Sequence, residues 1–401
     1  MGLQDKYDRK DIRRLNAVNV LNQLRINREL SRANIAAKLG LTRATVSNIV
    51  SELIAAGLLL EAEYLEGQSG RPGLLLQLNP NFGAMIALEI DVDRVVIMLT
   101  NFKQVRLWRQ SVAMPKGASV DTGLGLAEGL LSRALKIAKD KALRCLGIGV
   151  AWAGLVNRNS GELAYGPTSR WENVPLRQVW EDKYGLPVYV ENEAHAAAIG
   201  MYHFNNDAEK NDIVYLSLGV GLGAGVIIDG NLLRGRQGYA GQVGHVSHSP
   251  NGHPCSCGKT GCWITEVGAV AILRELSNAN VSVNHDASDE VAWIDQVCEM
   301  AEAGDEAVLS TLANIGQHLG EGIARLVETF NPSSVIVGGR LGKVIKYASP
   351  SIAEVLKNRP MHAMGESVEL TVSCSEEDSL VGCLASVFDA AMKNPVFDSV
   401  S

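Results

Sequence analysis

The sequence lacks any run of apolar residues long enough to span a bilayer. Its first sixteen residues, MGLQDKYDRKDIRRLN, lack both the apolar core and the cleavage site of a secretory signal. We therefore expect a cytoplasmic protein with no membrane partner. The chain has 401 residues, of which 46% are apolar and 20% charged, and this is typical of a globular protein with two or three domains.

Cysteine is scarce, with only seven residues. In a reducing compartment, clustered cysteines are more often metal ligands or redox groups than disulfides. Three of the seven fall within eight positions, in the segment PCSCGKTGCW at residues 254–263. The other four stand alone among apolar neighbours and are interpreted as small core residues. They are Cys145, Cys298, Cys374 and Cys383.

The chain also lacks an overall positive charge, and its net charge of −7 argues against nucleic acid as a partner of the whole molecule. The charge is unevenly distributed, however. Residues 1–80 contain eleven Lys and Arg against eight Asp and Glu, a net +3, whereas the remaining 321 contain 26 against 36, a net −10. Any contact with a polyanion is therefore expected at the N-terminus.

Residues 1–80 have the pattern of a winged helix-turn-helix domain. Apolar residues recur every three positions from Ile12 to Leu24, which predicts a helix with one buried face. The segment SRANIAAKLG and the segment at 42–57, TRATVSNIVSELIAAG, each open on a capping Ser or Thr and end at glycine. Alternating residues at 58–79 then predict a β-hairpin with a glycine-rich tip. Two short helices joined by a tight turn and preceded by a third are typical of DNA-binding proteins.

The exposed face of the third helix has short polar side chains and an arginine, which are residue types that contact base edges and phosphates in the major groove. An arginine between Gly70 and Pro72 at the hairpin tip suits a minor groove. The alternative is a solvated polar face with no ligand. The expected DNA-binding residues are Ser31, Thr42, Arg43, Thr45, Ser47, Asn48 and Arg71. Because one such domain, called the head below, contacts only a few base pairs, we expect a dimer or a dimer of dimers on a palindromic double-stranded operator.

After residue 80 the sequence alternates between strand-like and helix-like segments. PVYVEN leads directly into EAHAAAIGMY, and LGEGIARLVETF precedes the apolar segment SSVIVGG. This alternation predicts an α/β body. Strand-rich segments open at residues 83 and 212, which indicates an internal duplication.

The cysteine cluster supplies three thiolates and, ten residues upstream, one imidazole. Such a set matches a tetrahedral structural zinc site, which leaves no open position for a reactive water. Cys-x-Cys is a poor match to the Cys-x-x-Cys redox motif. His248 and His253 compete for the fourth position, but His245 is preferred. The expected Zn²⁺ ligands are His245, Cys255, Cys257 and Cys262.

Three segments, in this order, make the chain similar to the ROK family of sugar kinases and sugar-responsive repressors. They are WENVPLRQVWEDKYGLPVYVENEAHAAA, LSLGVGLGAGVIIDGNLLRGRQGYAGQVGH and the cysteine cluster, whose pattern is the family's zinc signature. The resemblance covers nearly the whole chain and implies a two-lobed, actin/hexokinase-like body over residues 81–401. The lobes would be about 81–190 with the C-terminal helix, and 191–385. The winged head makes the chain resemble the family's repressors, which include the xylose and N-acetylglucosamine repressors.

The segments that would carry kinase chemistry differ from the family's pattern. The kinases hold ATP phosphates in an Asp-x-Gly-Gly-Thr loop, whereas this chain has EIDVD at residues 89–93. Carboxylates in place of glycines disfavour a bound triphosphate. The family's Asn-Asp pair, whose aspartate is the catalytic base, is Asn192-Glu193 here, and the longer side chain misplaces the carboxylate. We therefore expect no enzyme activity.

The resemblance also implies a sugar pocket between the lobes. Gln242 replaces a usual glutamate there, and Ile264 replaces another, with Glu266 two positions further along. The effector is therefore expected to be a sugar or polyol, with a pentose or deoxy sugar among the candidates, and a pocket without a ligand is the alternative. The expected effector-binding residues are Asn192, Glu193, Gln242, His245 and Glu266.

These expectations combine into a sequence-specific transcriptional regulator, a repressor released when a sugar-like effector biases lobe closure and moves the heads out of register. His245 would both bind zinc and contact the effector. Two rival hypotheses remain. One is an active ROK sugar kinase with an appended DNA-binding head, and the other is a repressor controlled by a protein partner.

Overall fold

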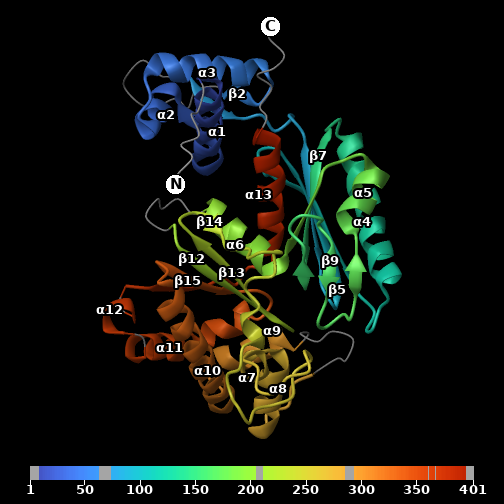
Figure 1. The fold of residues 1–401 in the computed structure, drawn as a ribbon, viewed down its shortest axis with the longest axis vertical. Coiled ribbons are helices and arrows are strands. Elements are labelled where there is room, and N and C mark those ends of the chain that lie inside the picture. Colours follow the sequence, from blue (N-terminus) through green and yellow to red (C-terminus); the bar gives the residue numbers. More distant parts are fainter. Residues whose placement is uncertain are drawn as a thin grey trace.

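The computed structural model describes residues 9–62, 74–204, 211–284, 293–359, 361–365 and 367–393. Figure 1 shows a small head above two larger lobes, each built on a β-sheet, with helix α13 running from beneath the head down between the lobes. The last strand of the head ends at Leu78, and the first strand of the body begins at Ala84. None of the helices within these ranges combines the length and apolar character needed to cross a membrane.

The head is a winged helix-turn-helix, as predicted. Its hairpin is antiparallel, and a two-residue strand pairs with the other side of the second hairpin strand. Its elements are α1 (Arg9–Asn27), β1 (Leu30–Ser31), α2 (Arg32–Leu39), α3 (Arg43–Ala55), β2 (Leu59–Ala62) and β3 (Leu75–Leu78). Val46, Ile49, Val50 and Leu53 of α3 are buried and form the centre of the head's core.

The buried face predicted for the first helix is wrong at its N-terminal end. Ile12 and Leu15 are 49% and 54% exposed, whereas Ala17, Leu21 and Leu24 are buried. A spacing of three residues drifts by about 60° per step around an α-helix. The stripe therefore rotates away from the core, and only its C-terminal part packs against the rest of the head.

The first lobe is a mixed sheet in the order β11-β7-β4-β5-β6. Helices α4 and α5 cover one face of this sheet, and α13 covers the other (Figure 1). Its main elements are β4 (Ala84–Ile90), β5 (Arg94–Asn101), β6 (Arg106–Ala113), α4 (Val120–Asp140), β7 (Cys145–Trp152), α5 (Leu176–Tyr184), β11 (Val188–Asn192) and α13 (Asp378–Lys393). A three-stranded satellite sheet consists of β8 (Leu155–Val156), β9 (Leu163–Tyr165) and β10 (Glu172–Val174).

The second lobe has a sheet in the order β14-β13-β12-β15-β16, with helices on both sides. Its strands are β12 (Ile213–Leu218), β13 (Leu222–Ile228), β14 (Asn231–Leu232), β15 (Ser334–Gly338) and β16 (Glu369–Val372). Its helices are α6 (Glu193–Phe204), η1 (Val243–His245), α7 (Ile264–Val267), α8 (Ala269–Asn278), α9 (Ile294–Glu302), α10 (Glu306–Phe330), α11 (Gly342–Asn358) and α12 (His362–Gly365).

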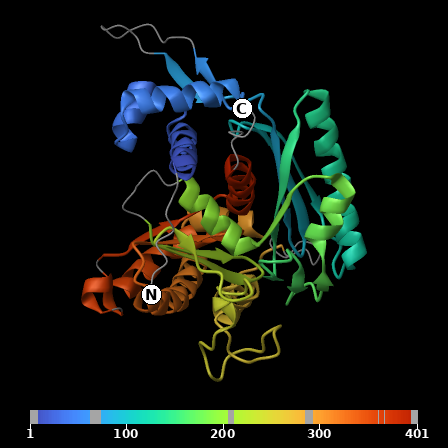
Figure 2. The same cartoon turned by 45° about the horizontal axis from the view of Figure 1, so that its top comes forward.

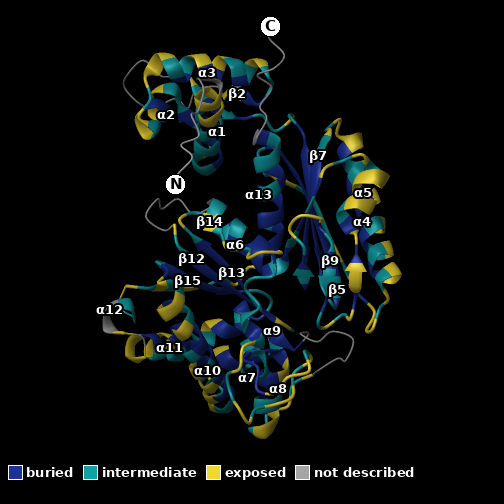
Figure 3. Ribbon diagram, in the orientation of Figure 1, coloured by how far each residue is buried: buried dark blue, intermediate teal, exposed yellow. Residues whose placement is uncertain are grey.

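The two sheets share one topology. In each, three consecutive antiparallel strands are followed by two strands that add in parallel beside the first. The internal duplication predicted from the sequence is thus confirmed. The central strands of both sheets and the inner faces of their helices are buried, whereas the edge strands β6, β14 and β16 are only partly covered. The outer faces of α4 and α5 are exposed (Figure 3).

The head shares an apolar core with the body. One cluster contains Leu21 and Leu24 of α1 together with Phe102, which follows β5, and Phe388 of α13. The rings of Phe102 and Phe388 stack with centroids 4.9 Å apart. The head is therefore packed against the body rather than tethered to it, and movements of α13 can reach it directly.

Candidate functional site

The predicted DNA-binding face lies on α2 and α3. The Oγ atom of Ser31 accepts a hydrogen bond from the backbone N–H of Asn34 at 3.2 Å, and the Oγ1 atom of Thr42 accepts one from Thr45 at 3.1 Å. Both side chains therefore cap a helix, as the sequence predicted. They fix where α2 and α3 begin and so orient the residues that follow.

The remaining predicted residues of this face differ in exposure. Arg43 and Asn48 are exposed on α3, while Thr45 and Ser47 are partly buried beside them. Arg71 lies outside the described residues. An exposed arginine in the first turn of a capped helix sits where the helix can enter a major groove, and the geometry of the described residues is compatible with that role.

A second site is the predicted cysteine cluster, whose four ligand atoms all lie within 4.8 Å of one another. Nδ1 of His245 is 3.4 Å from Sγ of Cys255, and Sγ of Cys257 is 3.6 Å from Sγ of Cys262. Partial burial, followed by the charge of Lys259, lowers the pKa of His245, so its imidazole is neutral and able to bind a cation. These residues can hold a metal ion.

Glycines make this convergence possible. Gly258 and Gly261 have φ angles of 89° and 71°, and a Cβ atom at Gly261 would lie only 1.7 Å from the carbonyl oxygen of Ser249. No other residue type fits at Gly261 without moving the chain. The loop thereby turns back toward η1, which carries His245.

The two histidines that competed for the fourth ligand position lie elsewhere. His253 is exposed, and His248 faces α10. His248 forms a second compact group with His318 and Glu321. Its Nδ1 lies 3.2 Å from Arg325, and Glu321 also pairs with Arg359. With two guanidinium groups against these side chains, the second group does not favour a cation.

A cavity of about 130 Å³ lies between the two lobes. Both lobes contribute to it, through the end of β4, the start of α6, the turn between β12 and β13, and the start of α13. Four of the five predicted effector-binding residues line it. They are Asn192, Glu193, Gln242 and His245. His245 therefore belongs both to the metal cluster and to the wall of the cavity.

Glu266, the fifth predicted effector-binding residue, is not brought to the cavity. Its carboxylate lies 3.4 Å from the hydroxyl of Thr265 and 3.9 Å from Arg274. Ile264, two positions earlier, does line the cavity. Residues two apart on a helix point about 200° apart, so α7 can present only one of them to the cavity.

Glu193 has an unusual environment for a carboxylic acid. Its Oε1 accepts a hydrogen bond from Ser217 at 2.7 Å. Burial, followed by the negative charges of Glu89 and Asp91, raises the pKa of Glu193 to about 8. The group therefore retains its proton near neutral pH, and its hydroxyl can donate a hydrogen bond to an oxygen acceptor in the cavity.

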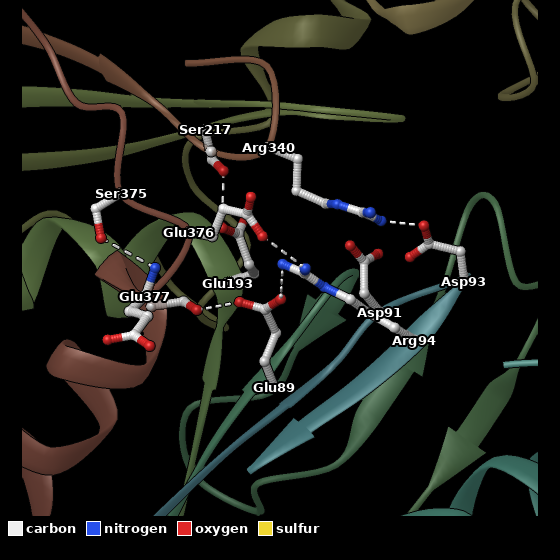
Figure 4. Close-up of polar contacts among 12 residues, drawn as sticks. Glu89, Asp91, Asp93, Arg94, Glu193, Ser217, Arg340, Ser375, Glu376 and Glu377 are labelled. Atoms are coloured by element: carbon white, nitrogen blue, oxygen red, sulfur yellow. Dashed lines mark hydrogen bonds and ion pairs between the residues drawn. The ribbon is translucent and has the colours of Figure 1, made fainter. Parts of the chain in front are cut away.

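The segment at residues 89–93 fills the position predicted for a phosphate loop with acidic side chains (Figure 4). Burial, followed by the charges of Asp93 and Glu89, raises the pKa of Asp91 to about 6. Glu89 accepts a hydrogen bond from Ser379 at the start of α13.

Ion pairs tie this segment to the opposite lobe. Arg340, two residues after the end of β15, pairs with Asp93, and Arg94 lies 3.0 Å from Glu376 (Figure 4). Despite its burial, contacts with Lys343 and Arg94 lower the pKa of Glu376 to about 2. Two arginines thus pair with carboxylates beside the cavity, Arg340 with Asp93 and Arg94 with Glu376, and these contacts connect the lobes.

Sequence reasoning missed these arginines, as well as a histidine that positions part of the cavity wall. His195, fully buried on α6, lies 2.9 Å from the carbonyl oxygen of Ala240, two residues before Gln242. Its other ring nitrogen lies 3.3 Å from Glu191, which also binds Arg234 at 2.6 Å. The pattern of the sequence contains no signal for the contacts with Ala240 and Arg234, because they join residues 45 and 43 positions apart.

Known proteins resemble this chain over nearly its whole length. It is 32% identical to the xylose repressor of Caldicellulosiruptor bescii, over 96% of this chain and 98% of that protein. It is 27% identical to the xylose repressor of Bacillus subtilis, over 92% and 93%, and 24% identical to the N-acetylglucosamine repressor of Escherichia coli O157:H7, over 94% and 93%.

Solved structures share the fold. A ROK family transcriptional regulator, a homologue of the E. coli MLC protein, superposes with a TM-score of 0.77 at 25% identity, over 96% of this chain and 97% of that one. A ROK family glucokinase from Streptomyces griseus, solved with glucose and AMPPNP, gives 0.62 at 27% identity, over 75% and 98%. A sequence profile described as the ROK family matches residues 85–389. Since that profile covers well over half of the sequence, the chain belongs to the ROK family.

Proposed function

We propose that this chain is a sequence-specific DNA-binding repressor that a sugar or polyol releases from its operator. The proposal rests on one combination of features. A winged helix-turn-helix head is joined to a kinase-like body, and that body has the acidic segment at residues 89–93 where the family's kinases have their phosphate-binding loop. The relatives named as repressors are matched over 92–96% of this chain and 93–98% of their own length. They support the proposal as a whole.

The same observation argues against an enzyme. An ATP triphosphate would have to approach Asp91 and displace Arg340 from Asp93 before that arginine could contact it. Charges of the same sign in a cleft of low dielectric repel strongly. The family includes kinases, such as the glucokinase that shares this fold. The proposal is that this member retains the cleft for recognition without phosphoryl transfer.

The metal of the cysteine cluster is proposed to be structural Zn²⁺. Bond lengths of about 2.0–2.3 Å in a tetrahedral zinc site separate its ligand atoms by about 3.5–3.8 Å. The sulfur–nitrogen and sulfur–sulfur separations of 3.4 and 3.6 Å agree with that geometry. Zinc would join the loop at 254–263 to His245 and so fix one wall of the effector cleft.

The cavity suits a neutral, hydroxyl-rich effector. A protonated Glu193 can donate a hydrogen bond, and Gln242 can both donate and accept. Ile264 adds an apolar surface to the same cavity. The xylose repressors among the relatives make D-xylose the first compound to test.

The regulator is proposed to act in the cytoplasm as a dimer or a dimer of dimers on a palindromic operator. One head presents a single recognition helix, and tight binding to a specific site usually needs two heads on one duplex. An effector that changes the closure of the lobes would then change the distance or orientation between the heads.

The test begins with selection of a duplex from a randomised library by the full-length protein. D-xylose, D-glucose, N-acetylglucosamine and L-fucose are then screened for a rise in melting temperature and for release of that duplex. We expect one sugar to raise the melting temperature and to weaken DNA binding by tenfold or more, the size of a typical allosteric coupling of about 1–3 kcal/mol. Selection without enrichment would refute the DNA-binding role. Enrichment with no response to any sugar or polyol would favour control by a protein partner.

A further inference from the structure

Two helices connect the effector cleft to the DNA-binding head. Helix α6 begins at Glu193 and α13 begins at Asp378, and both residues line the cavity. Helix α13 runs from the cleft up to the head (Figure 1), and the far ends of both helices lie against α1 (Figure 2). Each helix therefore contacts both the cavity and the first helix of the head.

The two helices are packed backbone against backbone. A Cβ atom at Gly200 of α6 would lie 2.8 Å from the carbonyl oxygen of Asp378. A Cβ atom at Gly382 of α13 would lie only 1.6 Å from the carbonyl oxygen of Ala196. With so little side-chain material between them, neither helix can shift without carrying the other. We treat them as one rigid element.

At the far end of this element, three side chains form a polar chain. Nη1 of Arg25 on α1 donates to Nδ1 of His203 on α6, and Nε2 of His203 lies 2.7 Å from Oδ2 of Asp389 on α13. Because arginine can only donate, Nδ1 must be the acceptor, so Nε2 carries the hydrogen and donates to Asp389. The imidazole thus links a cation on the head to an anion on the body.

Burial makes this link specific. Arg25 is only 7% exposed, and its guanidinium lies 5.8 Å from the centre of the Phe388 ring. Breaking a buried ionic contact by removing one partner is costly, because the other charge remains in a region of low dielectric. Arg25 will therefore follow its partners when they move, rather than exchange them for water.

We propose that the Arg25–His203–Asp389 chain is the contact through which the occupancy of the effector cleft controls the DNA-binding head. A shift of α6 and α13 at the cleft moves His203 and Asp389 together, and Arg25 passes the movement to α1. Helix α1 shares the head's apolar core with the recognition helix α3. This inference rests on the proposed function and specifies how the effector site is coupled to the DNA-binding site.

A second polar contact between head and body provides a control. Lys103, in the turn between β5 and β6, donates to Gln77 and lies 3.7 Å from Glu29. Both partners belong to the head, but the turn that carries Lys103 does not line the cavity. Loss of this contact perturbs the junction without interrupting the two helices.

The experiment uses reciprocity, since DNA must affect the cleft as strongly as the cleft affects DNA. Amide hydrogen exchange is measured on the full-length protein, free and saturated with its selected duplex. In the wild type we expect the duplex to change exchange in segments 193–200 and 378–385 by about fivefold or more. His203→Leu should abolish this change. His203→Gln should retain it, because the glutamine amide can accept from Arg25 and donate to Asp389.

Lys103→Met should also retain the change, and Asp389→Ala should abolish it if His203→Leu does not fold. If no duplex is selected, the proposed function fails and this inference falls with it. If the duplex binds but exchange at the two segments is unchanged, the proposed function stands and the inference is overturned. Persistence of the change in His203→Leu or Asp389→Ala would overturn it equally.

Discussion

Replacing Glu193 with glutamine should make the protein more stable at alkaline pH and leave its stability at acidic pH nearly unchanged. Glutamine has the same shape and retains a carbonyl oxygen for the hydrogen bond from Ser217, which is 2.7 Å long in the wild type. The substitution removes only the ionisable carboxyl, which loses its proton when the protein unfolds near neutral pH. Any change in the pH dependence of stability therefore reports on the raised pKa of Glu193 in the cavity.

The sign follows from the pKa of Glu193, which is raised from 4.5 to about 8. Below pH 4.5 the carboxyl is protonated in both the folded and the unfolded state. Between pH 4.5 and 8 the unfolded state releases the proton while the folded state keeps it, so the free energy of unfolding falls as pH rises. At 1.36 kcal/mol per pKa unit, the full loss is about 5 kcal/mol. Because water can enter the cleft, about 2 kcal/mol is a more realistic expectation.

The assay compares melting temperatures of the wild type and the Glu193→Gln variant from pH 5 to 9. A difference of about 2 kcal/mol corresponds to roughly 4–8 °C for a lobe of 150–250 residues. The two curves should converge near pH 5 and separate as the pH approaches 8. Glu299→Gln, on the exposed face of α9, is the matched control and should follow the wild type. Parallel curves of melting temperature against pH for Glu193→Gln and the wild type would refute the conclusion that Glu193 stays protonated in the folded state.

Three further predictions address the other sites. Cys262→Ser should lose the bound zinc, measured by atomic emission, and lower the melting temperature, whereas Cys298→Ser on α9 should keep the metal. Arg43→Ala should weaken binding of the selected duplex by about tenfold or more. If Arg43 contacts a phosphate, the substitution should also reduce the magnitude of the slope of log affinity against log salt concentration by about 1. Lys136→Ala on α4 should change neither the affinity nor the slope. The full-length protein incubated with ATP and each sugar of the panel should form no ADP, and a sugar phosphate detected by mass spectrometry would contradict the proposed loss of catalysis.

The features that the sequence predicts well depend on neighbours in the chain. Ser31 and Thr42 cap helices because the N–H groups they satisfy lie three residues ahead. The cysteines converge because glycines at 258 and 261 allow a tight turn. The α/β class of the body follows from the alternation of strand-like and helix-like segments. In each case the physical cause operates over a few residues and leaves a visible pattern.

The features that the sequence does not reveal depend on contacts between distant segments. Arg94 meets Glu376 across 282 positions, and Arg340 meets Asp93 across 247. Charged residues occur throughout the sequence, so nothing marks these four as partners. A three-residue apolar spacing implies that the stripe leaves one face of the helix, but it does not show at which end, so the exposure of Leu15 could not be located from the sequence.

These distant ion pairs give the acidic segment at residues 89–93 a second structural role. Considered from the sequence, its carboxylates only exclude a triphosphate. In the structure, Asp93 and Glu376 bind Arg340 and Arg94 across the cleft, so the carboxylates that we propose to disfavour ATP also link the lobes. A kinase must open and close around its nucleotide, whereas a repressor needs a body with few states that one small ligand can distinguish. The loss of the phosphate loop and the gain of a ligand-sensitive body can therefore be a single change in the chemistry of this cleft.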